Sequence, residues 1–257
     1  MMKNIDFNTI KIHCSSLGKL MTNPQNKSDR EAGNLSATAK THLIEVYAKQ
    51  LYNFEKQLDN KYIKKGNAVE EEAILELSMI LRRPLEKNEE VFYNQHFIGT
   101  PDVFYGDICF DVKSSYDWIT FLSNVPNELD STYYAQMQGY LNLLGLKKGY
   151  IVYVLLDTPP EELEKQKYYL FNKGNYISEE SPEFLRLWAE KEKNLIFSNT
   201  PIEERVLFFP VEADPEFIKL AEEKVIKARQ FLEDFHKKHR TFNENSIKNI
   251  IHELHNA

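Results

Sequence analysis

The segment from Gly99 to Ser115 constrains the fold more than any other part of the chain. It reads Gly-Thr-Pro-Asp-Val-Phe-Tyr-Gly-Asp-Ile-Cys-Phe-Asp-Val-Lys-Ser-Ser, so two runs rich in Val, Ile, Phe and Tyr flank Gly106-Asp107. This pattern predicts a β-hairpin, and glycine at the first central position suits a type II′ turn. In the resulting register, Asp102 lies directly opposite Asp111.

Two carboxylates and a lysine are predicted to share one face of this hairpin. Directly opposed residues of antiparallel strands lie about 4.5–5.5 Å apart between Cα atoms, so Asp102 and Asp111 repel unless a cation lies between them. Hard oxygen ligands of this kind suit Mg²⁺, with Mn²⁺ as a substitute. Alternation along the strand adds Lys113 to the same face and turns Phe110 and Val112 toward a core.

This arrangement predicts metal-dependent hydrolysis of a phosphodiester. An ammonium beside a metal-bound water can orient the water or stabilise charge on the phosphate under attack. The alternative interpretation is that Asp102 and Asp111 are exposed strand residues paired with nearby lysines. The upstream Pro101-Asp102 and the apolar opposite face of the hairpin favour the catalytic interpretation.

Two further motifs lie on predicted helices. Gly66-Asn67-Ala68-Val69-Glu70 is expected to open the helix before the hairpin, which makes Glu70 a candidate third carboxylate, although glutamates also suit the first turn of any helix. Gln136 and Tyr140 are four residues apart and therefore share one face of a helix after the hairpin. Their polar groups could hold the lysine or a phosphate.

The rest of the chain alternates between helical and strand patterns. Helices are expected at Leu35–Asn60, Asn67–Leu81, Ser131–Leu144 and Ser181–Phe197, and strands at Gly149–Leu156, Lys167–Phe171 and Arg205–Pro210. We expect one domain over residues 1–257, with a core at 60–175, N-terminal helices at 1–60 and a C-terminal helical extension at 176–257. The fold class is α/β (α+β), with a mixed central sheet flanked by helices.

A long C-terminal helix is predicted to begin at Asp214-Pro215. Its apolar residues recur every three or four positions, at Ile218, Ala221, Val225, Ala228, Leu232 and Phe235. Docking against the core of the same chain is the favoured explanation, and a contact between subunits is the alternative. The polar tail beyond Arg240 is expected to be a loosely held short helix.

Composition limits the other possibilities. The 257 residues carry a formal net charge of −7, which disfavours a protein that simply coats nucleic acid but not an enzyme with a carboxylate metal site. No apolar run approaches the roughly 20 residues of a membrane helix. Cys14 and Cys109 are too few for a disulfide framework. A cytoplasmic protein without a membrane association is the default expectation.

Together these motifs resemble the PD-(D/E)XK nucleases, specifically the branch with lambda exonuclease, YqaJ-like viral recombinases and the RecB nuclease domain. The resemblance rests on Glu70, Pro101-Asp102, Asp111-Val112-Lys113 and Gln136-x-x-x-Tyr140, in that order. Ile12–Met21 also looks like the opening helix of this branch. The resemblance implies a restriction-endonuclease-like core and Mg²⁺-dependent cleavage of DNA, often 5′ to 3′ from a duplex end in phage-type recombination.

The resemblance also implies individual roles. Asp102, Asp111, Val112 and Glu70 would bind the metal, Lys113 would be the catalytic lysine, Gln136 and Tyr140 would support it, and Ser15 would bind a DNA phosphate. A single-strand annealing protein is the implied partner, and a homo-oligomer, by resemblance a trimer, the implied assembly. Two cysteines cannot hold the iron–sulfur cluster of some relatives.

The chain departs from the family at two positions. Where lambda exonuclease carries arginines that hold a terminal phosphate, the aligned residues are Asn8 and Ile119. An endonuclease or structure-specific nuclease of the same fold is therefore an alternative function, and a non-catalytic DNA-binding scaffold is another.

Overall fold

The computed structural model describes residues 5–55, 61–125 and 129–255. Its centre is a four-stranded mixed sheet in the order β4-β5-β6-β7, in which β5 and β6 are parallel and the two outer pairs are antiparallel. The strands are β4 (Val103–Tyr105), β5 (Ile108–Ser115), β6 (Lys148–Leu155) and β7 (Val206–Glu212). The mixed α+β class expected from the sequence is confirmed.

A second, three-stranded sheet lies beside the first, in the order β1-β3-β2. Its strands are β1 (Ile12–His13), β2 (Phe92–Tyr93) and β3 (Phe97–Gly99). The region from Phe92 to Ser115 therefore supplies four strands to two sheets, and the predicted hairpin accounts for two of them. The extra turn forms because the Asn94 side chain accepts hydrogen bonds from the amides of His96 and Phe97, both at 2.8 Å.

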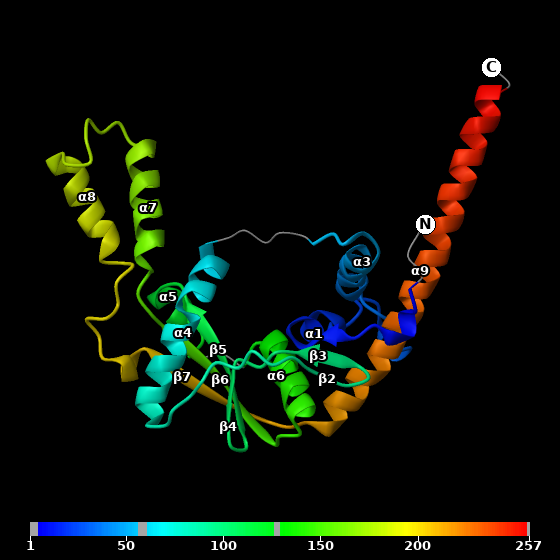
Figure 1. Ribbon diagram of the computed structural model, residues 1–257, viewed down its shortest axis with the longest axis horizontal. Coiled ribbons are helices and arrows are strands. Elements are labelled where there is room, and N and C mark those ends of the chain that lie inside the picture. Colours follow the sequence, from blue (N-terminus) through cyan, green and yellow to red (C-terminus); the bar gives the residue numbers. More distant parts are fainter. Residues whose placement is uncertain (1–4, 56–60, 126–128, 256–257) are drawn as a thin grey trace.

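Helices cover both faces of the central sheet (Figure 1). They are α1 (Cys14–Met21), α2 (Lys27–Glu31), α3 (Ala37–Tyr52), α4 (Lys61–Leu81), α5 (Trp118–Leu122), α6 (Ser131–Leu144), α7 (Pro160–Lys173), α8 (Pro182–Glu192) and α9 (Pro215–His255), with short 3₁₀ turns at Phe7–Thr9 and Ile202–Glu204. None of them is long and apolar enough to span a bilayer, within the parts of the chain described.

Alternation along β5 assigns its side chains to two cores. Phe110 packs with Val152 and Val154 of β6 against Val69 and Ala73 of α4. Cys109 belongs to the other and larger core, which α1, α3, α6 and α9 complete. Asp111 and Lys113 share the orientation of Cys109, so they face α6, whereas the predicted apolar orientation of Phe110 and Val112 is confirmed.

The position of α6 is fixed by a close crossing with α1. A Cβ atom on Gly18 would lie 2.6 Å from Thr132 Cα, and one on Gly139 would lie 2.7 Å from Cys14 Sγ. Larger residues at either glycine would force the two helices apart. This crossing therefore holds α6 at the distance from β5 that its polar side chains require.

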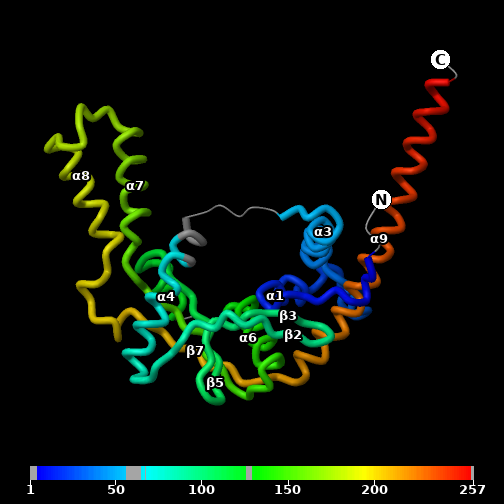
Figure 2. The backbone as a smooth tube through the Cα atoms, viewed as in Figure 1, coloured from blue at the N-terminus to red at the C-terminus, as the bar shows by residue number. Residues whose placement is uncertain are grey.

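The first half of α9 docks against the body of the same chain, as the apolar seam predicted. Ala221, Val225, Ala228 and Leu232 are buried, and the Arg229 guanidinium donates to the carbonyls of Ile10 and Gln95. The tail beyond Arg240 is not a separate short helix, because α9 runs without a break to His255 and projects from the body (Figures 1 and 2).

Three other expectations about elements need correction. The strand expected at Lys167–Phe171 lies within α7, which Pro160 and the first-turn acids Glu161 and Glu162 initiate. The helix expected to reach Asn60 ends at Tyr52, because Asn53 adopts the left-handed conformation that caps a helix; residues 56–60 lie outside the described part. The helix expected to reach Phe197 ends at Glu192.

Candidate active site

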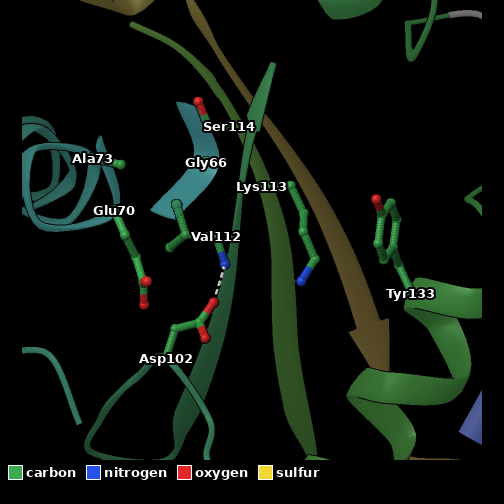
Figure 3. Close-up of a pocket in the computed structure, with 8 residues that line it drawn as sticks. All are labelled: Gly66, Glu70, Ala73, Asp102, Val112, Lys113, Ser114 and Tyr133. Carbon is green, nitrogen blue, oxygen red and sulfur yellow. Dashed lines mark hydrogen bonds between the residues drawn. The ribbon is translucent and has the colours of Figure 1, made fainter. Parts of the chain in front are cut away.

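The hairpin forms in the predicted register. Val103 pairs with Phe110, Phe104 with Cys109 and Tyr105 with Ile108. Gly106 has a φ of +56°, whereas Asp107 is not among the residues with positive φ, as a type II′ turn requires. One step further along this register, Asp102 lies opposite Asp111. Asp102 Oδ2 accepts a hydrogen bond of 2.8 Å from the Val112 amide (Figure 3).

Asp111 is fully buried and lies at the centre of a polar network. Its Oδ2 is 2.8 Å from the Lys113 ammonium, and its Oδ1 accepts a 2.9 Å hydrogen bond from the Gln136 amide. The same Gln136 nitrogen is 3.0 Å from the Tyr140 hydroxyl, and Gln136 Oε1 is 3.5 Å from Lys113 Nζ. The structure thus brings together Asp111, Lys113, Gln136 and Tyr140, which the sequence had singled out.

The electrostatics of the site reflect two carboxylates that are largely removed from solvent. Burial, followed by the charge of Asp111, raises the pKa of Asp102 to about 7. Burial alone would lower the pKa of Lys113, but the Asp111 and Asp102 carboxylates outweigh that effect and raise it above its usual value. Burial and the Asp111 charge also raise the pKa of Tyr140. Lys113 is therefore an ammonium at neutral pH.

A cavity of about 370 Å³ opens beside this network (Figure 3). Residues from α4, the hairpin and α6 surround it: Gly66, Glu70, Ala73, Asp102, Val112, Lys113, Ser114 and Tyr133. Glu70 faces the cavity from α4, where its carboxylate is 3.3 Å from Lys87 Nζ. The expectation that Gly66–Glu70 opens its helix is wrong, because α4 already begins at Lys61.

A buried lysine fastens α4 to the sheet next to this cavity. Lys65 is only 2% exposed, donates a 3.0 Å hydrogen bond to the Tyr116 carbonyl, and lies 4.9 Å from the centre of the Phe197 ring. Burial lowers the pKa of Lys65 to about 8. Because Tyr116 directly follows β5, this contact sets the position of Glu70 relative to Asp111 and Lys113.

The donor groups around the cavity fit a hard divalent cation. Asp102 and Asp111 supply carboxylate oxygens whose mutual repulsion a cation would relieve. The Val112 amide points toward Asp102, beyond the end of β4. Because the amide and the carbonyl of a strand residue point to the same side, the Val112 carbonyl also points to the side of Asp102. Within the described residues, no group of three acidic, histidine or cysteine side chains is arranged to hold a metal ion. Glu70 would have to leave its ion pair with Lys87 to become a ligand beside Asp102 and Asp111.

Ser15 lies apart from this cavity. It is exposed in the first turn of α1 and lines a second cavity, of about 460 Å³. Basic and acidic side chains both line that cavity, and two of the basic ones form ion pairs, Lys49 with Glu55 and His42 with Glu45. The basic side chains are Lys11, His13, Lys19, His42 and Lys49. The structure therefore places Ser15 near the ammonium groups of Lys11 and Lys19 but away from the Asp102–Asp111 network, and its phosphate-binding role stays a prediction.

Sequence reasoning missed Tyr133. Its ring forms one wall of the cavity beside Asp102, and Lys113 Nζ lies 5.0 Å from the ring centre. The signal was present in the spacing, because Tyr133, Gln136 and Tyr140 follow each other by three and four residues and so share one face of α6.

Solved structures of other proteins share this architecture. A phage-related exonuclease from Haemophilus somnus 129PT shares 26% sequence identity at a TM-score of 0.72, over 90% of this chain and 97% of that one. The alkaline exonuclease LHK-Exo from Laribacter hongkongensis shares the fold, with 14% identity and a TM-score of 0.59, over 94% of this chain and 95% of that one. LHK-Exo has also been solved in complex with dAMP.

No protein-family model matches the sequence, and no curated protein matches it. The structural relatives are both exonucleases, and they agree with the resemblance to the lambda exonuclease branch of the PD-(D/E)XK nucleases that the motifs indicated.

Proposed function

From the fold of the phage-type exonucleases and the buried Asp102–Asp111–Lys113 network, we propose that this protein is a metal-dependent DNA nuclease, acting as a 5′–3′ exonuclease on duplex ends. The observation that carries the proposal is the Lys113 ammonium, held 2.8 Å from the fully buried Asp111 at the wall of an open cavity. Such a placement of unlike charges serves little purpose for stability alone, because burying an ion pair is costly.

Asp102, Asp111, Glu70 and the Val112 carbonyl would hold Mg²⁺, or Mn²⁺ in its place. The bound cation would supply a nucleophilic water and neutralise charge on the scissile phosphate. In the metal-free site the Asp111 and Asp102 carboxylates raise the pKa of Lys113, and we assign its ammonium an electrostatic role. Its ammonium therefore orients the attacking water or stabilises the negative charge that develops on the phosphate. Gln136 bridges Asp111 and Tyr140 and keeps the carboxylate aligned.

The role of Glu70 is tested by its dependence on metal concentration. Glu70→Gln removes one negative charge from the cavity, so half-maximal activity should require about tenfold more Mg²⁺, while activity at saturating Mg²⁺ falls less. Lys87→Gln is the matched control: it releases Glu70 from its ion pair and should leave the Mg²⁺ requirement equal or lower. An unchanged requirement in Glu70→Gln would remove Glu70 from the metal site.

End-dependence is the finer part of the proposal. Neither Asn8 nor Ile119 offers a cation, and Ile119 is 80% exposed on α5. We assign phosphate binding instead to Ser15, with Lys11 and Lys19 around it. An endonuclease of the same fold is the second candidate, which the missing arginines favour.

Linear and closed circular duplexes of one sequence separate the two. An exonuclease degrades only the linear form, and Ser15→Ala should weaken its preference for a 5′-phosphorylated end. Cleavage of the closed circle at a similar rate would establish the endonuclease.

The family resemblance extends the proposal to the protein's surroundings. A single-strand annealing protein would take up the strand that the nuclease exposes, and a trimer would enclose the duplex. We also propose that the protein acts in the cytoplasm. Sedimentation of the purified protein with and without duplex DNA tests the assembly: a single monomeric species in both would rule out the trimer.

A further inference from the structure

Tyr133 stands at the mouth of the catalytic cavity, in the first turn of α6 (Figure 3). The figure shows its ring beside the side chain of Lys113, whose nitrogen lies 5.0 Å from the ring centre. A second ring fixes this orientation. Tyr153 pairs with Lys113 across β5 and β6, and it meets Tyr133 nearly edge-on with ring centres 6.1 Å apart.

The hydrogen bonds of Lys113 do not by themselves fix the position of its ammonium, so the Tyr133 ring can contribute. A lysine ammonium has three N–H donors on a flexible chain of four methylenes. Asp111 Oδ2 takes one donor at 2.8 Å, and Gln136 Oε1 lies at the limit of a hydrogen bond, 3.5 Å away. The face of Tyr133 covers a further side. The attraction between an ammonium and an aromatic face is larger where water is excluded, and the Lys113 side chain is only 20% exposed.

Two lysine–tyrosine contacts on the surface of the molecule lack this setting. Lys11 lies 5.2 Å from the centre of the Tyr93 ring, a similar separation, but Tyr93 is 69% exposed and does not line the catalytic cavity. Lys173 lies 5.7 Å from the Tyr169 ring, which is 65% exposed. An exposed contact of this kind fixes a lysine weakly, because water competes for the ammonium.

We propose that Tyr133 is a positioning residue of the nuclease: the face of its ring holds the Lys113 ammonium against Asp111 and directs it into the cavity. This inference rests on the proposed function. The ring face, and not the hydroxyl, performs the task, so phenylalanine can replace tyrosine whereas an aliphatic residue of similar bulk cannot.

Three variants test this assignment on linear duplex DNA at saturating Mg²⁺. Tyr133→Leu should lower kcat about tenfold with little change in KM, and Tyr133→Phe should retain at least about a third of the wild-type kcat. Tyr169→Leu, which removes the exposed ring beside Lys173, is the matched control and should match the wild type. In a Lys113→Ala background, Tyr133→Leu should cause no further loss, because the group it positions is gone. Equal losses in Tyr133→Phe and Tyr133→Leu, or independent losses in the double variant, would overturn the assignment.

A second readout does not depend on activity. Protons above an aromatic face resonate upfield, so in protein labelled at the lysine ε-carbons the Lys113 signal, identified by its absence in Lys113→Ala, should lie upfield. It should move back in Tyr133→Leu and stay upfield in Tyr133→Phe. A Lys113 signal that Tyr133→Leu leaves unchanged would refute the ring contact, whereas a wild type with this signal but no nuclease activity would refute the proposed function.

Discussion

The sheet around Lys113 and the arm formed by α7 and α8 both carry many charged side chains, but they place them differently. In the sheet, Asp111 is fully buried and its ion pair with Lys113 is shielded from water. In the arm, the ion pairs Lys165–Glu162 and Arg186–Glu190 lie on the surface, and α7 buries no residue. A small apolar cluster of Phe184, Trp188 and Leu195 holds the arm together instead.

This difference separates charges that matter for chemistry from charges that keep a surface solvated. Exposed ion pairs contribute little to stability because water screens them and long side chains lose entropy in forming them. Buried carboxylates are costly, and the cost is tolerated where a cation or a substrate will meet them. Substitutions in the two regions should therefore affect different properties: activity in the sheet, and local stability in the arm.

The largest effect is expected at Asp111. Asp111→Asn removes the charge that holds Lys113 and would bind the metal, and it should lower kcat on linear duplex DNA by at least about 1000-fold. The free energy of unfolding should change by less than about 2 kcal/mol, because relief of the repulsion between Asp102 and Asp111 offsets the loss of the Lys113 ion pair. Urea unfolding and Mg²⁺-dependent digestion measure the two effects. A variant that loses activity and stability together would point to a structural role for Asp111.

The second-largest effect is expected for a substitution in the arm. Phe184→Ala leaves a cavity in its apolar cluster and should cost about 3–5 kcal/mol of local stability. Hydrogen exchange should then accelerate over α7 and α8 and stay unchanged in β5, and kcat should change by less than about twofold. Faster exchange throughout β5 would show that the arm and the central sheet unfold as one unit, which would contradict their separation.

The smallest effect is a dependence of stability on pH. In the folded, metal-free protein Asp102 has a raised pKa, about 7, against about 3.9 when unfolded. The folded state therefore binds the extra proton between these values, so the protein loses stability as the pH rises from about 4 to about 7. Asp102→Asn does not lose stability in this way. In EDTA, the Tm of Asp102→Asn minus that of the wild type should therefore increase by a few degrees from pH 5 to pH 8. If the difference in Tm stayed constant with pH, Asp102 would not be desolvated beside Asp111.

The hairpin could be predicted because its constraints are local. Alternation fixes which face Asp111 and Lys113 share, and Gly106 fixes the turn, so the register follows without knowledge of the rest of the chain. Helix α6 was also predicted with its observed bounds, Ser131–Leu144, from its own apolar pattern. The polar positions of both elements then point at one another across the core.

What the sequence could not supply depends on contacts between distant elements. Tyr133 was missed because its role depends on its contact with Lys113. Only the packing of α6 on the sheet brings these two side chains together. The strand expected at Lys167–Phe171 was wrong because Tyr168, Tyr169, Leu170 and Phe171 suit a strand locally, yet the helix begun at Pro160 continues through them. The buried Lys65 gave no signal, since a lysine among other lysines reads as surface.

The measurement that tests the central claim most directly is Mg²⁺-dependent digestion of linear duplex DNA by the wild type, Lys113→Ala and the exposed control Lys165→Ala. We expect the wild type and Lys165→Ala to degrade the duplex, EDTA to stop both, and Lys113→Ala to be slower by at least about 100-fold. Digestion by Lys113→Ala at the wild-type rate, or wild-type digestion that persists in EDTA, would contradict this claim.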